Sequence, residues 1–256
     1  MTNSLFDLTG RVAIVTGTSR GLGQHMARAL ANAGADLVLA SRNRDHLLPF
    51  ETEIKARGRR AISLQLDVRS QASIEKMAAD AETAFEHVDI LVNNAGCNVR
   101  KPALEVTWDD WNLILDTNLR GSFFVAQAVA HFMVPRHYGR IINIGSVTSV
   151  AGYAGLGPYG ASRGGIRQLT MSLADDWGKH GITVNCLAPG RIHSEQIDQR
   201  LHPTPESREQ FARQIPLGYF GDPPDMAYLV TFLCSPRARY ITGERIHVDG
   251  GLRRAY

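Results

Sequence analysis

The stretch "VAIVTGTSRGLGQHMARAL", residues 12–30, joins an apolar run, three glycines and a segment of helical period. A continuous apolar run is typical of a strand buried on both faces of a parallel sheet. Gly17, Gly21 and Gly23 follow it at once and predict a tight turn that opens a helix. Bare backbone can approach a pyrophosphate, and a helix N-terminus offers amide donors to it. The stretch predicts a dinucleotide-binding unit; a glycine-rich turn without a ligand is the alternative.

The remaining chain repeats this alternation of short apolar runs with helical segments. Strands are expected at Val12–Thr16, Asp36–Ala40, Ala61–Leu66, Ile90–Asn93, Ile141–Ile144, Thr183–Leu187 and Arg245–Val248. Seven strands alternating with helices predict the α/β class, as a doubly wound (Rossmann-like) seven-stranded parallel sheet flanked by helices. We expect a single domain over residues 1–256.

Two other segments carry local signals. In "VTWDDWNLIL", Thr107 is the expected N-cap of a helix, Asp110 completes a capping box, and Val106 with Trp111 could form a hydrophobic staple. Residues 191–225 are polar and hold five of the eleven prolines. A long irregular insertion in a compact domain is usually a lid or a mobile loop, so a substrate lid is expected there.

Composition narrows the classes of protein. The 256 residues are 44% hydrophobic and 21% charged, and the net charge of +3 gives no nucleic-acid footprint. No apolar run is long enough to span a membrane, and the N-terminus lacks a signal-peptide pattern. Three cysteines without a C-x-x-C spacing indicate reduced thiols in a cytoplasmic protein. The nine histidines are scattered and form no H-E-x-x-H motif, so no metal site is expected.

The second strand bears on the choice of dinucleotide. Ligands sit at the carboxyl ends of such strands, where an acid would hold a ribose 2′-hydroxyl. Here "LVLASRN" places Ser41 and Arg42 at that position, and Arg20 adds a cation within the glycine loop. Two guanidiniums and a hydroxyl suit a 2′-phosphate. The sequence therefore favours NADP(H) over NAD(H); the alternative is that both arginines are solvated surface charges.

A tyrosine and an arginine in "PYGASRGG", residues 158–165, share one face if the segment is helical. Tyr159 and Arg163 are four residues apart, so they would point into the same space. A phenol beside a fixed cation is a plausible acid/base device.

With these residues in view, the chain resembles the short-chain dehydrogenase/reductases, over nearly its whole length. The resemblance is carried by motifs in the family's order: "TGTSRGLG" at 16–23, "NNAG" at 93–96, "TNLRG" at 117–121, Ser146 thirteen residues before Tyr159, "APG" at 188–190 and "VDGG" at 248–251. It implies the sheet order 3-2-1-4-5-6-7 and a cytoplasmic homotetramer or homodimer. The nearest likenesses are to gluconate 5-dehydrogenase-like and 3-oxoacyl reductase-like members.

The resemblance also implies roles for single residues. Tyr159 would be the general acid or base, Ser146 would bind the substrate oxygen, and Asn118 would hold a water in a proton chain. Asp67 would accept a bond from the adenine amine. Together with the glycine loop, the expected cofactor-binding set is Gly17, Ser19, Arg20, Gly21, Leu22, Gly23, Ser41, Arg42, Asp67, Val68, Asn94, Ala95, Gly96, Tyr159, Arg163, Pro189, Gly190, Ile192 and Ser194. The expected catalytic set is Asn118, Ser146, Tyr159 and Arg163.

One departure from the family pattern concerns the partner of the tyrosine. The family has Tyr-x-x-x-Lys, and this chain has arginine at position 163. The family lysine binds ribose hydroxyls, stabilises the phenolate and passes protons on. Arginine carries a permanent charge and five donors but does not readily lose a proton. A relay through Arg163 is therefore in doubt.

The substrate side gives weaker signals. Arg100 and Lys101 follow "NNAG", and Arg191 and His193 begin the expected lid, which suggests an anionic or polyhydroxy substrate. Coincidence of surface charges is the alternative. Tyr153 and Leu156 could supply apolar contacts to the substrate, and Cys97 is expected as a small buried filler.

These signals favour an NADP(H)-dependent oxidoreductase that interconverts a carbonyl and a secondary alcohol, acting on a sugar or sugar acid. A 3-oxoacyl-thioester reductase is the alternative within the enzyme class. A non-catalytic dinucleotide-binding homologue, which lost turnover through the change at position 163, is the alternative outside it.

Overall fold

The computed structural model of the chain describes residues 5–194 and 204–254. A seven-stranded sheet runs through its centre in the order β3-β2-β1-β4-β5-β6-β7, and every neighbouring pair is parallel. The strands are β1 (Val12–Thr16), β2 (Asp36–Ser41), β3 (Ala61–Gln65), β4 (Ile90–Asn93), β5 (Gly139–Ile144), β6 (Ile182–Pro189) and β7 (Arg245–Val248). The predicted fold class, a doubly wound parallel sheet, and the predicted strand order are confirmed.

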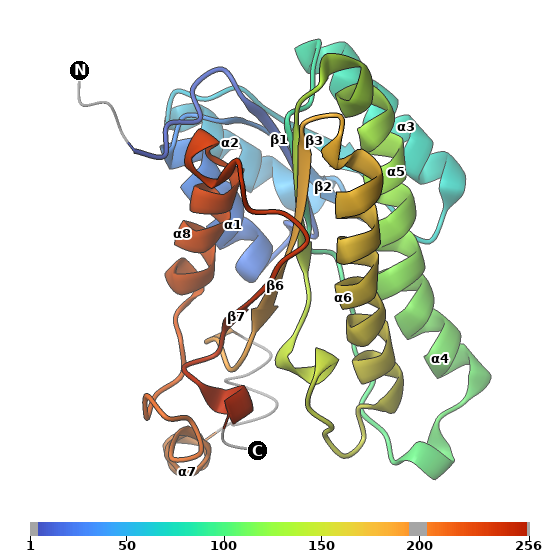
Figure 1. Cartoon of the computed structure of the whole chain (residues 1–256), viewed down its shortest axis with the longest axis vertical. Coiled ribbons are helices and arrows are strands. Elements are labelled where there is room, and N and C mark those ends of the chain that lie inside the picture. Colours follow the sequence, from blue (N-terminus) through green and yellow to red (C-terminus); the bar gives the residue numbers. More distant parts are fainter. Residues whose placement is uncertain (1–4, 195–203, 255–256) are drawn as a thin grey trace.

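Helices cover both faces of the sheet (Figure 1). Those of the described residues are α1 (Leu22–Asn32), α2 (Leu48–Ala56), α3 (Gln71–Phe85), α4 (Trp108–Leu115), α5 (Gly121–Met133), α6 (Gly157–Gly178), α7 (Pro205–Ala212) and α8 (Pro223–Cys234). Helices α1 and α8 pack together on one face, and α3, α5 and α6 lie on the other (Figure 1). A short π-helical turn, Asp116–Arg120, links α4 to α5.

Side-chain alternation along the strands builds a core on each face. In β1, Ala13 and Val15 join the core under α1 and α8, whereas Val12 and Ile14 join the core under α3 and α5. All of β1 is buried, which explains why its sequence is apolar without a break. Because all strands are parallel, the loops after their carboxyl ends meet at one edge of the sheet.

The observed elements differ from the predicted ones in a few places. β5 begins two residues early, at Gly139, and β6 spans Ile182–Pro189 instead of Thr183–Leu187, because each pairs with its neighbour along this extra length. β2 gains Ser41, and β3 ends one residue early. The predicted capping box is present: the Thr107 hydroxyl accepts from the Asp110 N–H at 3.1 Å.

The expectation of an irregular segment at 191–225 was wrong for part of its length. Residues 195–203 lie outside the described residues. Beyond them, α7 follows a capping box in which the Thr204 hydroxyl accepts from the Ser207 N–H, and α8 begins at Pro223. Pro205 and Pro223 stand in first helical turns, where a missing N–H costs nothing. Prolines that suggested a loop therefore mark two helix starts.

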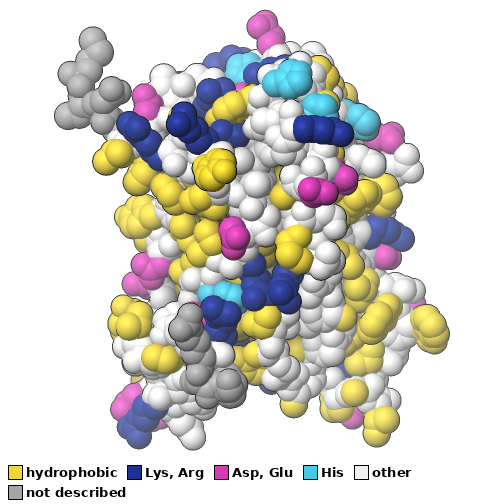
Figure 2. All heavy atoms as spheres, in the orientation of Figure 1, with side chains coloured by type: hydrophobic (Ala, Val, Ile, Leu, Met, Phe, Trp, Pro, Cys, Tyr) yellow, Lys and Arg dark blue, Asp and Glu magenta, His cyan; other side chains and the backbone are white. Residues whose placement is uncertain are grey.

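The face of the molecule drawn in Figure 2 has a positively charged patch near its centre. Lys or Arg side chains gather there beside a His side chain, where β7 and α6 lie in Figure 1.

Candidate active site

The glycine turn after β1 has the backbone geometry that its sequence predicts. Gly17 and Gly21 have φ angles of 71° and 65°, a region that residues with a Cβ rarely adopt. A Cβ on Gly17 would lie 2.9 Å from the Ala95 Cα, and one on Gly23 would lie 2.5 Å from the Gly17 carbonyl oxygen. Among the residues that the structure describes, no side chain caps α1 at Gly21. The first amides of α1 thus remain available to an anion, and a pyrophosphate fits this turn.

The loop after β4 is fastened to this turn. Asn94 donates from Nδ2 to the carbonyl oxygens of Thr16 and Gly17, at 2.9 and 3.2 Å. The backbone N–H groups of Asn94 and Ala95 donate to the Thr16 hydroxyl at 3.0 and 2.9 Å. The predicted cofactor residues Asn94 and Ala95 are therefore brought beside the glycine turn. Thr16, which holds both loops together, was missed as a site residue; its position directly before the first glycine was the available signal.

The residues expected at the adenosine end lie at the carboxyl ends of β2 and β3. Ser41 is buried, and its hydroxyl donates to the Asn43 carbonyl oxygen at 2.8 Å. Arg20 and Arg42 are exposed. Hydrogen bonds from Arg69, and more weakly the charge of Arg42, hold the pKa of Asp67 below its usual value. Arg42 is thus near Asp67, at the place where a 2′-phosphate is expected.

Two other predicted cofactor residues, Val68 and Leu22, have packing roles as well, and a third, Ser19, accepts a hydrogen bond. Val68 is buried, and a Cβ on Gly121 would lie 2.8 Å from its Cβ. Leu22 packs against the core under α1. Ser19 is exposed, and its carbonyl oxygen accepts from Gln24 Nε2 at 3.3 Å.

Tyr159 and Arg163 occupy successive turns near the start of α6. The Arg163 guanidinium carbon lies 4.9 Å from the centre of the Tyr159 ring. The Arg163 side chain is only 6% exposed, and its Nη1 donates to the carbonyl oxygen of Ile144, the last residue of β5, at 2.7 Å. A Cβ on Gly96 would lie 2.6 Å from Arg163 Nη2. The guanidinium is therefore fixed between β5, the loop after β4 and the tyrosine, and is no surface charge.

Asn118 lies in the π-helical turn and is fully buried. Its Oδ1 accepts from the Cys97 N–H at 2.8 Å, and its Nδ2 donates to the Cys97 carbonyl oxygen at 2.9 Å and to the Ser162 hydroxyl at 3.2 Å. Ser162 in turn donates to the Tyr159 carbonyl oxygen at 2.7 Å. Asn118 thus ties the loop after β4 to the turn that carries the tyrosine. Sequence reasoning missed Ser162, although it stands beside Arg163.

Ser146 follows β5 and is 7% exposed. Its hydroxyl oxygen accepts from the Thr148 N–H at 3.2 Å, as the cap of a short helical turn. Accepting this bond leaves the hydroxyl proton available for donation to another oxygen.

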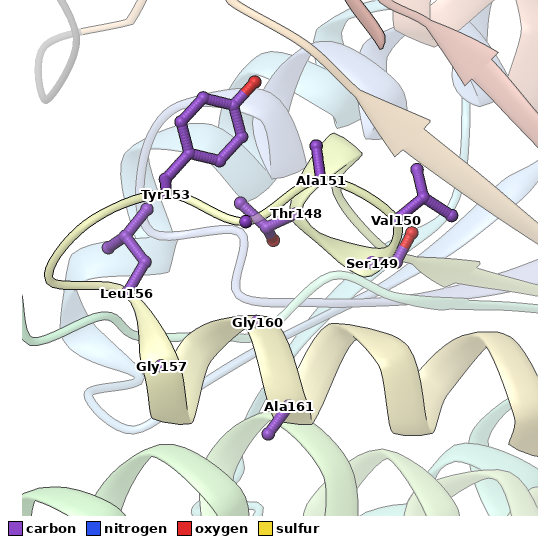
Figure 3. A pocket seen from close by; sticks show the side chains of 10 residues that line it. Thr148, Ser149, Val150, Ala151, Tyr153, Leu156, Gly157, Gly160 and Ala161 are labelled. Carbon is purple, nitrogen blue, oxygen red and sulfur yellow. The ribbon is translucent and has the colours of Figure 1, made fainter. Parts of the chain in front are cut away.

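A cavity of about 350 Å³ opens between the start of α6 and the loop before it; Ser146, Tyr159 and Arg163 are not among its described lining residues. Figure 3 shows Tyr153 and Leu156 on that loop, Ser149 and Val150 on the short turn after β5, and Gly157 and Gly160 on α6. Tyr153 and Leu156, which the sequence proposed for apolar substrate contacts, both line it.

The four cations expected around the cleft have different surroundings. Lys101 forms an ion pair with Asp110 at 2.6 Å. Arg100 donates to the Ala154 carbonyl oxygen at 3.2 Å. The Arg191 guanidinium carbon lies 4.5 Å from the Phe211 ring centre and 5.9 Å from that of Tyr153.

Their positions relative to the cavity also differ. The ring of His193 lies 5.5 Å from that of Phe220. Phe220 belongs to a small hydrophobic core that includes the segment after α7. Arg191 lies against the ring of Tyr153, and Tyr153 also lines the cavity.

The loop after β6 packs tightly on the end of β7. The Gly190 N–H donates to the Val248 carbonyl oxygen at 2.9 Å, and a Cβ on Gly190 would lie 2.7 Å from the Asp249 Cβ. Pro189 ends β6, and Ile192 is buried in a bridge with Gly221. Ser194 is the last described residue before the gap at 195–203.

The described ranges, 5–194 and 204–254, hold no cluster of three His, Cys, Asp or Glu residues suited to a metal ion. In the same ranges, no helix has the length and apolar character needed to cross a membrane.

Comparison with known proteins agrees with this geometry. A family model described as enoyl-(acyl carrier protein) reductase matches residues 17–253. Gluconate 5-dehydrogenase of Gluconobacter oxydans is 38% identical over 248 residues, covering 97% of this chain and 96% of that protein. The 3-oxoacyl-(acyl-carrier-protein) reductase of Aquifex aeolicus is 37% identical over 246 residues, covering 96% and 98%.

A solved structure extends the comparison to three dimensions. Gluconate 5-dehydrogenase from Burkholderia cenocepacia, in complex with NADP and tartrate, has 36% identity and a TM-score of 0.94, covering 98% of both chains. These full-length matches are to named dehydrogenases and reductases, and the match in three dimensions agrees with the observed fold and sheet order. The chain belongs to the short-chain dehydrogenase/reductase family of oxidoreductases.

Proposed function

We propose that this chain uses NADP(H) to interconvert a carbonyl and a secondary alcohol, with a sugar acid or related polyhydroxy carboxylate as substrate. The observation that carries the reaction type is the Tyr159–Arg163 pair, in which a buried guanidinium lies against the phenol ring. The pair lies on α6, which lines the cavity with Gly157, Gly160 and Ala161 and not with the pair itself.

The glycine turn, Ser41 and the exposed Arg20 and Arg42 would hold the cofactor. Their donor set suits a pyrophosphate and a 2′-phosphate. When bound, the nicotinamide supplies the hydride for reduction or accepts it in oxidation. The NADP complex of the Burkholderia relative supports this choice of cofactor.

The protein's own groups handle the proton and the oxygen. Ser146 donates a hydrogen bond to the substrate oxygen, and Tyr159 Oη gives a proton to that oxygen during reduction or removes it during oxidation. The permanent charge of Arg163 stabilises the phenolate that forms in reduction. Arg163 does not itself lose the proton, so reprotonation of Tyr159 runs through other groups, of which Asn118 is the predicted one.

The proposal of an anionic substrate rests on Arg191. Its guanidinium carbon lies 4.5 Å from the centre of the Phe211 ring and 5.9 Å from that of Tyr153, and Tyr153 lines the cavity. A guanidinium held by aromatic faces keeps a fixed orientation for bidentate contact with a carboxylate. The gluconate-type relatives support the same substrate class.

A panel of carbonyl substrates tests the proposal. We expect NADPH oxidation with keto-sugar acids, and a KM at least tenfold higher for them in Arg191→Gln, about 1.4 kcal/mol of lost binding. Neutral ketoses should show no such change, and Arg100→Gln is the matched control. Absence of turnover on every keto-sugar acid would reject the substrate class; absence on all carbonyls would reject the reaction.

A second candidate substrate is a 3-oxoacyl thioester. The Aquifex relative and the matching family model both support it. The two classes separate in the same assay, because an acyl thioester would give a higher kcat/KM than any keto-sugar acid and would respond little to Arg191→Gln.

The described part of residues 191–225 is proposed as the substrate lid. Phe211 and Phe220 form a small core with Val147, next to the candidate serine. We expect amide exchange in residues 204–222 to slow when NADPH and substrate bind, as a closing lid would require. Full protection of these amides in the ligand-free protein would contradict this.

We further propose a cytoplasmic homotetramer or homodimer. Cys97, Cys186 and Cys234 are all free thiols. A groove of about 530 Å³ runs between α4, α5 and α6, and the exposed Phe124 lies in it. A second copy would bury this apolar surface. Phe124→Lys should then lower the molar mass measured by light scattering, whereas an unchanged mass would exclude this face as the contact.

A further inference from the structure

The edge strand β7 carries two polar side chains on the face that looks toward α6. Arg245 and His247 stand two residues apart, so they share one side of the strand, while Ile246 and Val248 pack into the core under α8. Arg245 pairs in register with Cys186 of β6, which places it at the end of the sheet beside α6.

These two side chains have buried hydrogen-bonding atoms that find no partner. Among residues 5–194 and 204–254, nothing accepts from Arg245 Nε or Nη1, and nothing pairs with His247 Nε2, although all three atoms are buried. Buried donors of a charged group are normally satisfied, because leaving them unpaired is costly. Unpaired donors of this kind indicate a missing acceptor.

Further cations surround the same place. Arg167 of α6 and Arg253, which follows β7, are both close enough to influence Arg245 and His247. Burial, and then the charges of Arg253 and Arg245, lower the pKa of His247 to about 4. The acid that opposes them, Asp249, already accepts from the N–H groups of Gly251 and Arg253.

We propose that Arg245 and His247 form a binding site for an oxyanion, either a carboxylate or a phosphate. Arg167 and Arg253 lie at the border of this site. Planar guanidinium groups match the two oxygens of such an anion, and a guanidinium offers donors but no acceptor. Two sources share this chemistry: a small soluble anion, or an acidic group of a second copy of the chain. The site shares no residue with the Tyr159–Arg163 pair.

Thermal unfolding with NADPH present, to fill the cofactor turn, tests the site. Inorganic phosphate is titrated against chloride at constant ionic strength. We expect phosphate to raise the Tm of the parent in a saturable manner, as a ligand of the native state does. Arg245→Gln should weaken this effect at least tenfold in apparent affinity, and Arg253→Gln should weaken it in part. Arg239→Gln, an exposed arginine elsewhere, is the matched control.

Each outcome bears on the proposal. If phosphate stabilises the parent and Arg245→Gln equally, the site does not exist. If Arg245→Gln fails to fold, Arg245→Lys and Arg253→Gln provide the comparison, and equal responses in both would overturn the proposal. A second copy as the source predicts that Arg245→Gln and added phosphate both lower the molar mass of the parent assembly; a soluble anion predicts an unchanged mass with the Tm response intact.

Discussion

Replacing Arg163 with methionine removes its charge and keeps most of its length. In the parent, the guanidinium carbon lies 4.9 Å from the centre of the Tyr159 ring. A unit charge at this distance stabilises a phenolate by about 3 kcal/mol at an effective dielectric constant near 20. Tyr159 is half-buried, and solvent screening reduces this to about 1.5–2 kcal/mol. We therefore expect Arg163→Met to slow alcohol oxidation roughly 10- to 30-fold near neutral pH.

The assay is steady-state alcohol oxidation at saturating NADP⁺, from pH 6 to pH 9, with Arg163→Lys as the charge-preserving control. We expect Arg163→Met to be slower than Arg163→Lys at each pH, because lysine keeps the charge beside the phenol ring. Arg163→Lys should stay within a few-fold of the parent. Tyr159→Phe should lose nearly all turnover while still binding NADPH. A methionine variant as active as the parent at every pH would refute the role given to the guanidinium.

Three further predictions concern other parts of the chain. We expect the parent to bind NADPH at least tenfold more tightly than NADH, about 1.4 kcal/mol, and Ser41→Asp to shift this preference toward NADH. Fluorescence titrations measure both affinities, and equal affinities in the parent would remove the 2′-phosphate argument. Gly23→Ala should weaken NADPH binding at least tenfold, because its Cβ would lie 2.5 Å from the Gly17 carbonyl oxygen, whereas Gly178→Ala, which meets no atom within 4 Å, should bind normally. Burial lowers the pKa of His247 from 6.5 to about 4, so the unfolded chain binds more protons between these values and stability should fall as the pH drops from 6.5 toward 4. Urea midpoints should show a flatter pH dependence in His247→Gln, and an identical dependence would contradict this pKa.

The fold could be predicted because the sequence signals for its strands, turns and helix starts each lie within a few consecutive residues. Each strand of a buried parallel sheet is apolar along its length, and Gly17, Gly21 and the Thr107 capping box mark turns and helix starts within a few residues. The strand ends could not be placed as well, since Gly139 and Ile182 enter the sheet only by pairing with each other. These contacts join distant parts of the chain and leave no pattern in either segment.

The candidate site was predictable in its residue types but not in its connections. The spacing of Tyr159 and Arg163 indicates a shared helix face, which the structure has. The π-helical turn around Asn118 depends on bonds to Cys97 and Ser162, which are 21 and 44 residues away. The unpaired donors of Arg245 were equally hidden, because a strand pattern does not tell which face a neighbouring helix leaves open.

The contact between Gly96 and Arg163 restricts the order in which this site can change. A Cβ at position 96 would lie 2.6 Å from Arg163 Nη2 and 3.2 Å from Asn118 Oδ1. An alanine at 96 is therefore incompatible with the arginine in its present position, whereas a side chain at 163 without Nη2 would leave that space empty. Substitutions at two residues in contact are not additive. In this geometry, a side chain at 96 could be introduced only after the guanidinium had left that space, so each position limits what the other can hold.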